Sequence, residues 1–152
     1  MEINHACVNY GQPEYGCPSD GNCQGCSYYG PVTATFANGI KAINVTPHDL
    51  TFEENGEKIT VPTSGIVINA RAKEAVVKNG TPTLVRTSFV SSEEDTKKLE
   101  ELERDYPGII PIGSIIAAQA FPGRVFGMTP MPGFERVHPS EKRMNPDKFT
   151  TF

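Results

Sequence analysis

The sequence predicts an α+β fold: a predominantly antiparallel sheet with one or two helices, preceded by a cysteine- and tyrosine-rich N-terminal arm. Three observations support this prediction. Short apolar runs alternate with Asn-Gly pairs between residues 32 and 90, an amphipathic segment follows from Ser92, and all four cysteines of the 152-residue chain lie within the first 26 positions. We therefore expect an arm at residues 1–31 and a single α+β domain at residues 32–152 with an extended C-terminal tail.

Six strands are expected between residues 32 and 90, because Asn-Gly is the strongest short signal for a tight hairpin turn. Asn38-Gly39 separates VTATFA from IKAINVT, and Asn55-Gly56 separates DLTFEE from EKITVP. A third pair, at 79–80, separates GIVINARAKEAVVK from TPTLVRTSFV. Tight turns join antiparallel neighbours, so most strand pairs are expected to be antiparallel.

One clear helix is expected after these strands. Ser92 is placed to cap its first turn, and the acidic residues at 93–95 suit the positive end of the helix dipole. Pro107-Gly108 ends the helix. An apolar stripe with spacing i, i+3 and i+7 marks the buried side, formed by Leu99, Leu102 and Tyr106.

The rest of the domain is expected to add two strands and a short helix. Residues 109–112 (IIPI) suit a buried strand, and Ser114 follows as a cap for a short helix that runs through Phe121. The segment RVFGMTPM predicts one more strand. Residues 132–152 are rich in proline and charge, and we expect a tail that docks on the same chain or on a neighbour.

Composition excludes several classes of protein. A net charge of −4 and a pI near 5.4 disfavour nonspecific binding to nucleic acid or to acidic membranes. No stretch approaches the roughly 18 apolar residues of a membrane span, and the first residues lack the basic and apolar regions of a secretory signal. We therefore expect a cytoplasmic protein without a membrane or nucleic-acid partner.

The cysteines have the spacing Cys-x9-Cys-x5-Cys-x2-Cys, which favours a metal site. A Cys-x2-Cys pair is the commonest half of a tetrahedral zinc site, because the turn between the cysteines places both sulfurs on one ion. Two disulfides, free thiols or a redox-active pair are the alternatives. We expect a closed, structural zinc site, with His5 as an alternative ligand, formed by Cys7, Cys17, Cys23 and Cys26.

Six residues of the domain are candidates for binding a small anionic ligand: Thr46, His48, Arg71, Arg86, Ser114 and Gln119. The first two follow a strand, where they either meet a ligand or stabilise the turn together with Asp49. The two arginines lie in otherwise apolar strands, where a guanidinium either binds a phosphate or carboxylate or pairs across the sheet. The last two belong to the short helix, whose free N–H groups could hold an anion, although no Walker lysine accompanies them.

Four short segments resemble a group of small bacterial and phage-encoded proteins of unknown function. Residues 43–48 (INVTPH) are similar to an I-N-L-T-P-H pattern, and residues 62–65 (PTSG) to a Pro-x-Ser-Gly step. Residues 84–87 (LVRT) and 114–120 (SIIAAQA) are similar to a V-V-R-T strand and an S-x-x-A-A-Q-A helix. The resemblance leaves out the cysteine-rich arm; it implies a compact α+β domain of mobile-element origin and no established reaction.

These observations favour a non-enzymatic, phage-related protein that holds an anionic, nucleotide-like ligand. The alternative is a structural or assembly protein, such as a virion or oligomer component, whose arm and tail dock on neighbouring copies. An enzyme is the third choice, because the sequence contains no nucleophile motif, open metal site or cofactor fingerprint.

Overall fold

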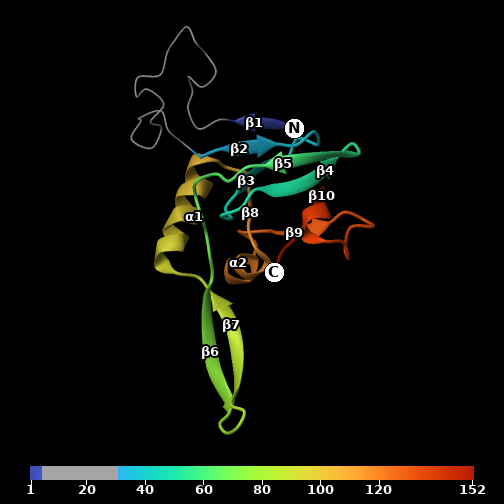
Figure 1. Cartoon of the computed structure of the whole chain (residues 1–152). Coiled ribbons are helices and arrows are strands. Elements are labelled where there is room, and N and C mark those ends of the chain that lie inside the picture. Colours follow the sequence, from blue (N-terminus) through green and yellow to red (C-terminus); the bar gives the residue numbers. More distant parts are fainter. Residues whose placement is uncertain (5–30) are drawn as a thin grey trace, which may run out of the picture.

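Two four-stranded sheets, two helices and a separate hairpin make up residues 1–4 and 31–152, the part of the chain that the computed structural model describes (Figure 1). This arrangement confirms the α+β class. Sheet A has the order β1-β2-β3-β8, with strands Glu2–Asn4, Thr33–Thr35, Lys41–Asn44 and Ile110–Ile112. Sheet B has the order β5-β4-β10-β9, with strands Glu57–Val61, Leu50–Glu54, Met144–Thr150 and Gly127–Pro130.

The remaining elements are the hairpin and the helices. Strands β6 (Arg71–Lys78) and β7 (Leu84–Val90) pair only with each other within the described residues. The helices are α1 (Glu93–Asp105) and α2 (Ile115–Ala120), with a 3-10 turn, η2, at Pro139–Glu141. No helix in this part of the chain is long and apolar enough to cross a membrane.

The Asn-Gly turns form where the sequence places them. Asn55 and Gly56 both adopt positive φ, 53° and 79°, as the tight turn between β4 and β5 requires. The turn at Asn38-Gly39 joins β2 to β3, and both hairpins are antiparallel as expected. The third turn is longer than expected, because β6 ends at Lys78 and β7 begins only at Leu84.

Sheet A lies between the helices and sheet B, so both of its faces are buried. Successive residues of β3 point to opposite faces. Ile43 packs with Leu99 and Leu102 of α1 and with Ala117 of α2 in one apolar cluster. The neighbouring Ala42 packs in a second cluster, together with Phe52, Leu50 and Val61 of sheet B and Ile112 of β8. One sheet therefore supplies residues to two cores.

The C-terminal segment is an interior strand of sheet B, which differs from the extended tail that the sequence suggests. β10 lies between β4, to which it is parallel, and β9, to which it is antiparallel. Phe149 packs near Phe52, with ring centroids 6.4 Å apart, and Arg143 donates to Glu53 at 2.6 Å. The segment thus docks on its own chain.

Both helices begin at the predicted caps. The hydroxyl of Ser92 accepts from the Asp95 N–H at 3.2 Å, and that of Ser114 accepts from the Ala117 N–H at 3.1 Å. Leu99 and Leu102 are buried as the stripe predicts, whereas Tyr106 forms the C-terminal cap of α1 and is exposed.

Candidate functional site

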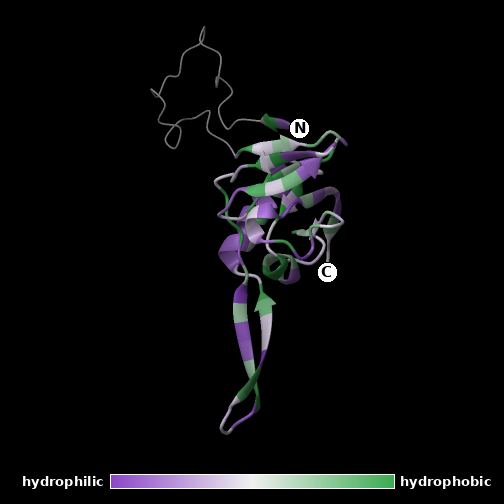
Figure 2. Cartoon of the chain, turned by 45° about the vertical axis from the view of Figure 1, so that its right-hand side comes forward, coloured by the Kyte–Doolittle hydropathy of each residue, from purple (hydrophilic) through white to green (hydrophobic). Residues whose placement is uncertain are grey.

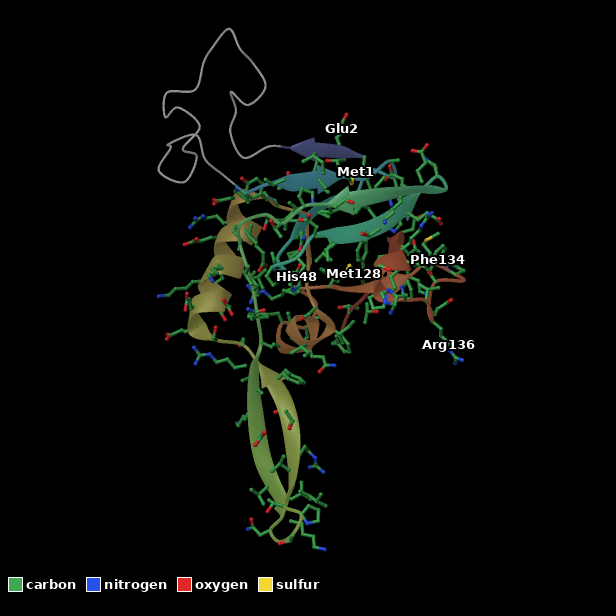
Figure 3. All side chains as sticks on the ribbon, in the orientation of Figure 1. Met1, Glu2, His48, Met128, Phe134 and Arg136 are labelled. Atoms are coloured by element: carbon green, nitrogen blue, oxygen red, sulfur yellow. The ribbon has the colours of Figure 1, made fainter. Side chains whose placement is uncertain are left out.

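The six predicted ligand residues lie in three separate places: the turn after β3, the β6–β7 hairpin, and α2. Each position determines which polar atoms are free to meet a ligand. Figure 3 shows His48 in the body of the molecule, while the hairpin projects away from that body.

The turn after β3 is organised by a buried amide, that of Asn44. Its Oδ1 accepts from the backbone N–H and from the hydroxyl of Thr46, at 2.9 and 2.6 Å. Its Nδ2 donates to the carbonyl oxygen of His48 at 2.7 Å. The carboxylate of Asp49 accepts a hydrogen bond from the Thr63 N–H at 3.2 Å. Thr46 and Asp49 therefore stabilise this turn, and His48 is exposed, as are its neighbours Pro47 and Asp49.

Sequence reasoning missed Asn44 and its partner Ser64. The hydroxyl of Ser64 donates to the Asn44 carbonyl oxygen at 2.6 Å, and both residues are buried. The available signal was an asparagine among buried apolar residues at the end of a strand, since a buried polar side chain needs partners. These contacts give the INVTPH and PTSG segments a shared structural role, because they hold one turn together.

The hairpin carries both predicted arginines, and the strand register shows that they share a face. Arg71 lies opposite Val90, Lys73 opposite Ser88, and Ala75 opposite Arg86. Opposite residues in an antiparallel pair point to the same side, as do residues two apart along a strand. Arg71, Lys73 and Arg86 thus form a basic face of the hairpin, and all three side chains are exposed. Within the described residues none of the three takes part in an ion pair.

The short helix α2 uses its N-terminal serine for its own cap. Ser114 accepts from Ala117 through its hydroxyl and from the Ala118 N–H through its carbonyl oxygen. Gly113 is needed for packing, because a Cβ at this position would lie 2.6 Å from a methyl group of the buried Val125. Gln119 is exposed. The packing of Gly113 against Val125 and the capping of α2 by Ser114 therefore explain the Gly-Ser step.

The described pockets do not unite these residues. The two largest have volumes of about 350 and 380 Å³ and lie on either side of the C-terminal half of α1. The first contains Lys98, Glu101 and Asp105, and the second contains the ion-paired Glu103 and Arg124. None of the four described pockets is lined by any of the six predicted ligand residues.

The predicted zinc ligands, Cys7, Cys17, Cys23 and Cys26, lie outside the described residues. Within residues 1–4 and 31–152 no three His, Cys, Asp or Glu side chains are grouped to hold a metal ion. The zinc site stays a prediction.

Four exposed apolar side chains lie in the distal part of the hairpin, which sequence reasoning did not single out. We call Val76, Val77, Leu84 and Val85 the distal cluster; their exposed fractions are 58, 58, 50 and 41%. Figure 2 shows hydrophobic residues in the distal part of both strands, next to the turn. Of the two strands, only Phe89 is even partly buried. The alternation of residue types was readable in the sequence, but it is the same for a free hairpin as for strands within a larger sheet.

Comparisons with protein families, with curated proteins and with solved structures found no match. The resemblance of residues 43–152 to small phage-encoded proteins therefore stays a prediction.

Proposed function

We propose that this chain is a structural, self-assembling protein in which the β6–β7 hairpin docks on a neighbouring copy. The single observation that supports this proposal is the exposure of the distal cluster on a projecting hairpin. A two-stranded hairpin is marginally stable by itself and needs further strands or a packing partner. Exposed apolar patches on such a feature are typical of protein interaction sites.

A second copy is the partner that the chain itself supplies. The hairpin leaves the body next to α2, whose Ile115 and Ile116 are each 43% exposed. One chain thus presents both a projecting apolar element and an apolar seat near its base. The C-terminal segment does not serve as a docking arm in this proposal, because β10 is an interior strand of its own sheet.

Light scattering on the full chain tests this proposal. We expect a mass that rises with concentration above the 16.6 kDa of one chain. A variant with Val76→Ser and Val85→Ser should return to that mass, since it removes apolar contacts from residues that lie opposite each other. Phe152→Ser is the matched control, because Phe152 is equally exposed but lies at the C-terminus. A wild-type protein that stays a monomer, or a hairpin variant that associates as well as wild type, would overturn the proposal.

The basic face supports a second candidate function, the binding of an anionic ligand. Three cations share one side of the hairpin without an acidic residue on that side, and guanidinium groups suit phosphate oxygens. Isothermal titration with nucleoside triphosphates and cyclic nucleotides should give heat that is lost on Arg71→Ala and Arg86→Ala. Lys58→Ala on β5, also exposed, is the control. No heat with any of these nucleotides would reject the candidate.

Two further properties belong to the proposal. We expect about one structural zinc per chain, bound by the four cysteines and lost on Cys23→Ser, as metal analysis by mass spectrometry will show. We also propose a cytoplasmic location, which is supported by the mildly acidic composition.

A further inference from the structure

The outer edge of β7 is unpaired along its whole length in the described chain, because the hairpin contains only β6 and β7. Along such an edge the N–H and C=O groups of alternate residues point away from the partner strand. β7 runs for seven residues, LVRTSFV, without a proline or glycine. It therefore offers a regular set of backbone donors and acceptors to another strand.

The two edges of the hairpin differ in a way that favours β7. β6 contains Arg71, Lys73 and Lys78, and its register shifts so that Val77 has no residue opposite it on β7. Charged residues and bulges are the features that protect exposed edges from strand pairing. β7 has one charged residue, Arg86, and no irregularity. The edge that lacks protection is the β7 edge.

We propose that β7 pairs with β7 of a second copy in antiparallel orientation, about a twofold axis at Thr87. This inference rests on the proposed self-assembly and specifies its geometry. In this register Leu84 lies opposite Val90 of the second copy, and Val85 lies opposite Phe89. The result is a four-stranded sheet in the order β6-β7-β7-β6.

The sequence of β7 is complementary to itself in this register. Apolar residues lie opposite apolar residues at both ends, Arg86 lies opposite Ser88 of the second copy, and no like charges lie directly opposite each other. Cross-strand pairs of this kind are the unit of sheet stabilisation. The same operation on β6 fails, because an axis at Glu74 sets two carboxylates opposite each other, and an axis at Ala75 sets Lys73 opposite the bulged Val77.

The surroundings of the β7 edge fit this pairing. With Leu84 of the second copy opposite Val90, the turn that precedes Leu84 lies beyond the end of β7. That end adjoins α2, where Ile115 and Ile116 are exposed. The second copy's turn, which contains Pro82, would therefore lie near the start of α1 and near α2.

Sedimentation equilibrium on three full-length variants tests the register, with a reducing agent present so that cysteine pairing does not contribute. Ser88→Arg, made together with Lys73→Ser so that no like charge lies opposite it in its own hairpin, places an arginine opposite Arg86 of the second copy at two symmetric points, and we expect dimerisation to weaken about tenfold or more. Adding Arg86→Glu to this variant turns both contacts into ion pairs and should restore the dimer. Thr60→Arg is the matched control, since Thr60 is an exposed hydroxyl residue on β5, the outer strand of sheet B.

The outcomes separate this inference from the proposed function. Weakening by Ser88→Arg, rescue by the added Arg86→Glu and no effect of Thr60→Arg support the β7 pairing. Association that depends on Val76 and Val85 but ignores Ser88→Arg would overturn the β7 register and leave hairpin-mediated assembly in place. A monomer at every concentration would overturn both.

Discussion

Asn44 shows how much a single side chain can organise when it is buried among apolar neighbours. It bonds the backbone and hydroxyl of Thr46 and the carbonyl of His48, which fixes the direction in which the chain leaves β3. Ser64, from the segment after β5, donates its hydroxyl to the Asn44 carbonyl oxygen at the same turn. Because one side chain makes several hydrogen bonds, its substitution should lower the free energy of unfolding substantially.

We expect Asn44→Ala to lower the free energy of unfolding by about 2–4 kcal/mol. The reason is that the truncation removes three hydrogen bonds, from the N–H and the hydroxyl of Thr46 and to the carbonyl oxygen of His48, at about 0.5–1.5 kcal/mol for each bond. Urea denaturation measures this loss. Asn69→Ala is the control, because Asn69 is exposed; a loss of equal size in both variants would contradict the role given to Asn44.

Gly113 lies in close contact with a buried side chain. Gly113→Ala brings a methyl group against Val125, a fully buried residue, and should destabilise the fold by about 1–3 kcal/mol through overpacking. Val125→Ala removes the clashing methyl groups, so the double variant should be more stable than the sum of the two single losses predicts. Strict additivity in thermal denaturation would show that this close approach is not the cause.

Among elements, the strands and helices between residues 32 and 121 could largely be predicted from the sequence, because their signals are local. An Asn-Gly turn forms through the φ angles of its own two residues, and a capping serine bonds only within the first turn of its helix. The parallel pairs β3–β8 and β4–β10 join residues far apart in the chain and leave no local mark. β10 was missed for a second reason, since MNPDKFT contains a proline and two charges and lacks the period of a half-buried strand.

The candidate site was less predictable for the same physical reason. Arg71 and Arg86 were correctly placed in strands, but strand periodicity does not reveal whether a third strand covers them. Ser114 was correctly predicted as a cap, because its signal, like that of the strands, is local.

Strand β4 contributes a contact that makes stability depend on pH. Burial by itself raises the pKa of Glu54, but hydrogen bonds from the amino group of Met1 and from the Ala37 N–H, with the positive charge of that amino group, leave it below the ordinary 4.5. A lowered pKa in the folded state means that this stabilisation is complete above pH 4.5 and is lost as the pH falls through the lowered value.

We therefore expect the unfolding free energy of the wild type to fall on acidification below pH 4.5 more steeply than that of Glu54→Gln. Urea denaturation at several pH values between about 3 and 7 measures the difference. Equal pH dependence in the two proteins would mean that Glu54 does not link β4 to β1 and to the turn after β2 in solution.

The described chain divides into a body with two buried cores and a hairpin that is exposed along both strands. We expect the body to be stable without most of the hairpin. Lys73 and Ser88 lie opposite each other, so a two-residue Asn-Gly turn can replace residues 74–87.

This shortened chain should unfold with a free energy within about 1 kcal/mol of the wild-type value, because the removed residues bury little surface. It should also stay monomeric in light scattering. A large loss of stability would show that the hairpin supports the body, and continued association would place the contact between copies elsewhere.

The one-residue shift in β6 has a consequence for how far association can proceed. A hairpin whose two outer edges both pair with other copies propagates into a fibre. A hairpin that can pair through one edge only is saturated by a single partner. Val77 is out of register and three cations lie along β6, so the β6 edge does not pair with a further copy and assembly stops at the β7 contact. The irregularity in β6 would thus set the stoichiometry at two and prevent the seven-residue strand β7 from starting an open polymer.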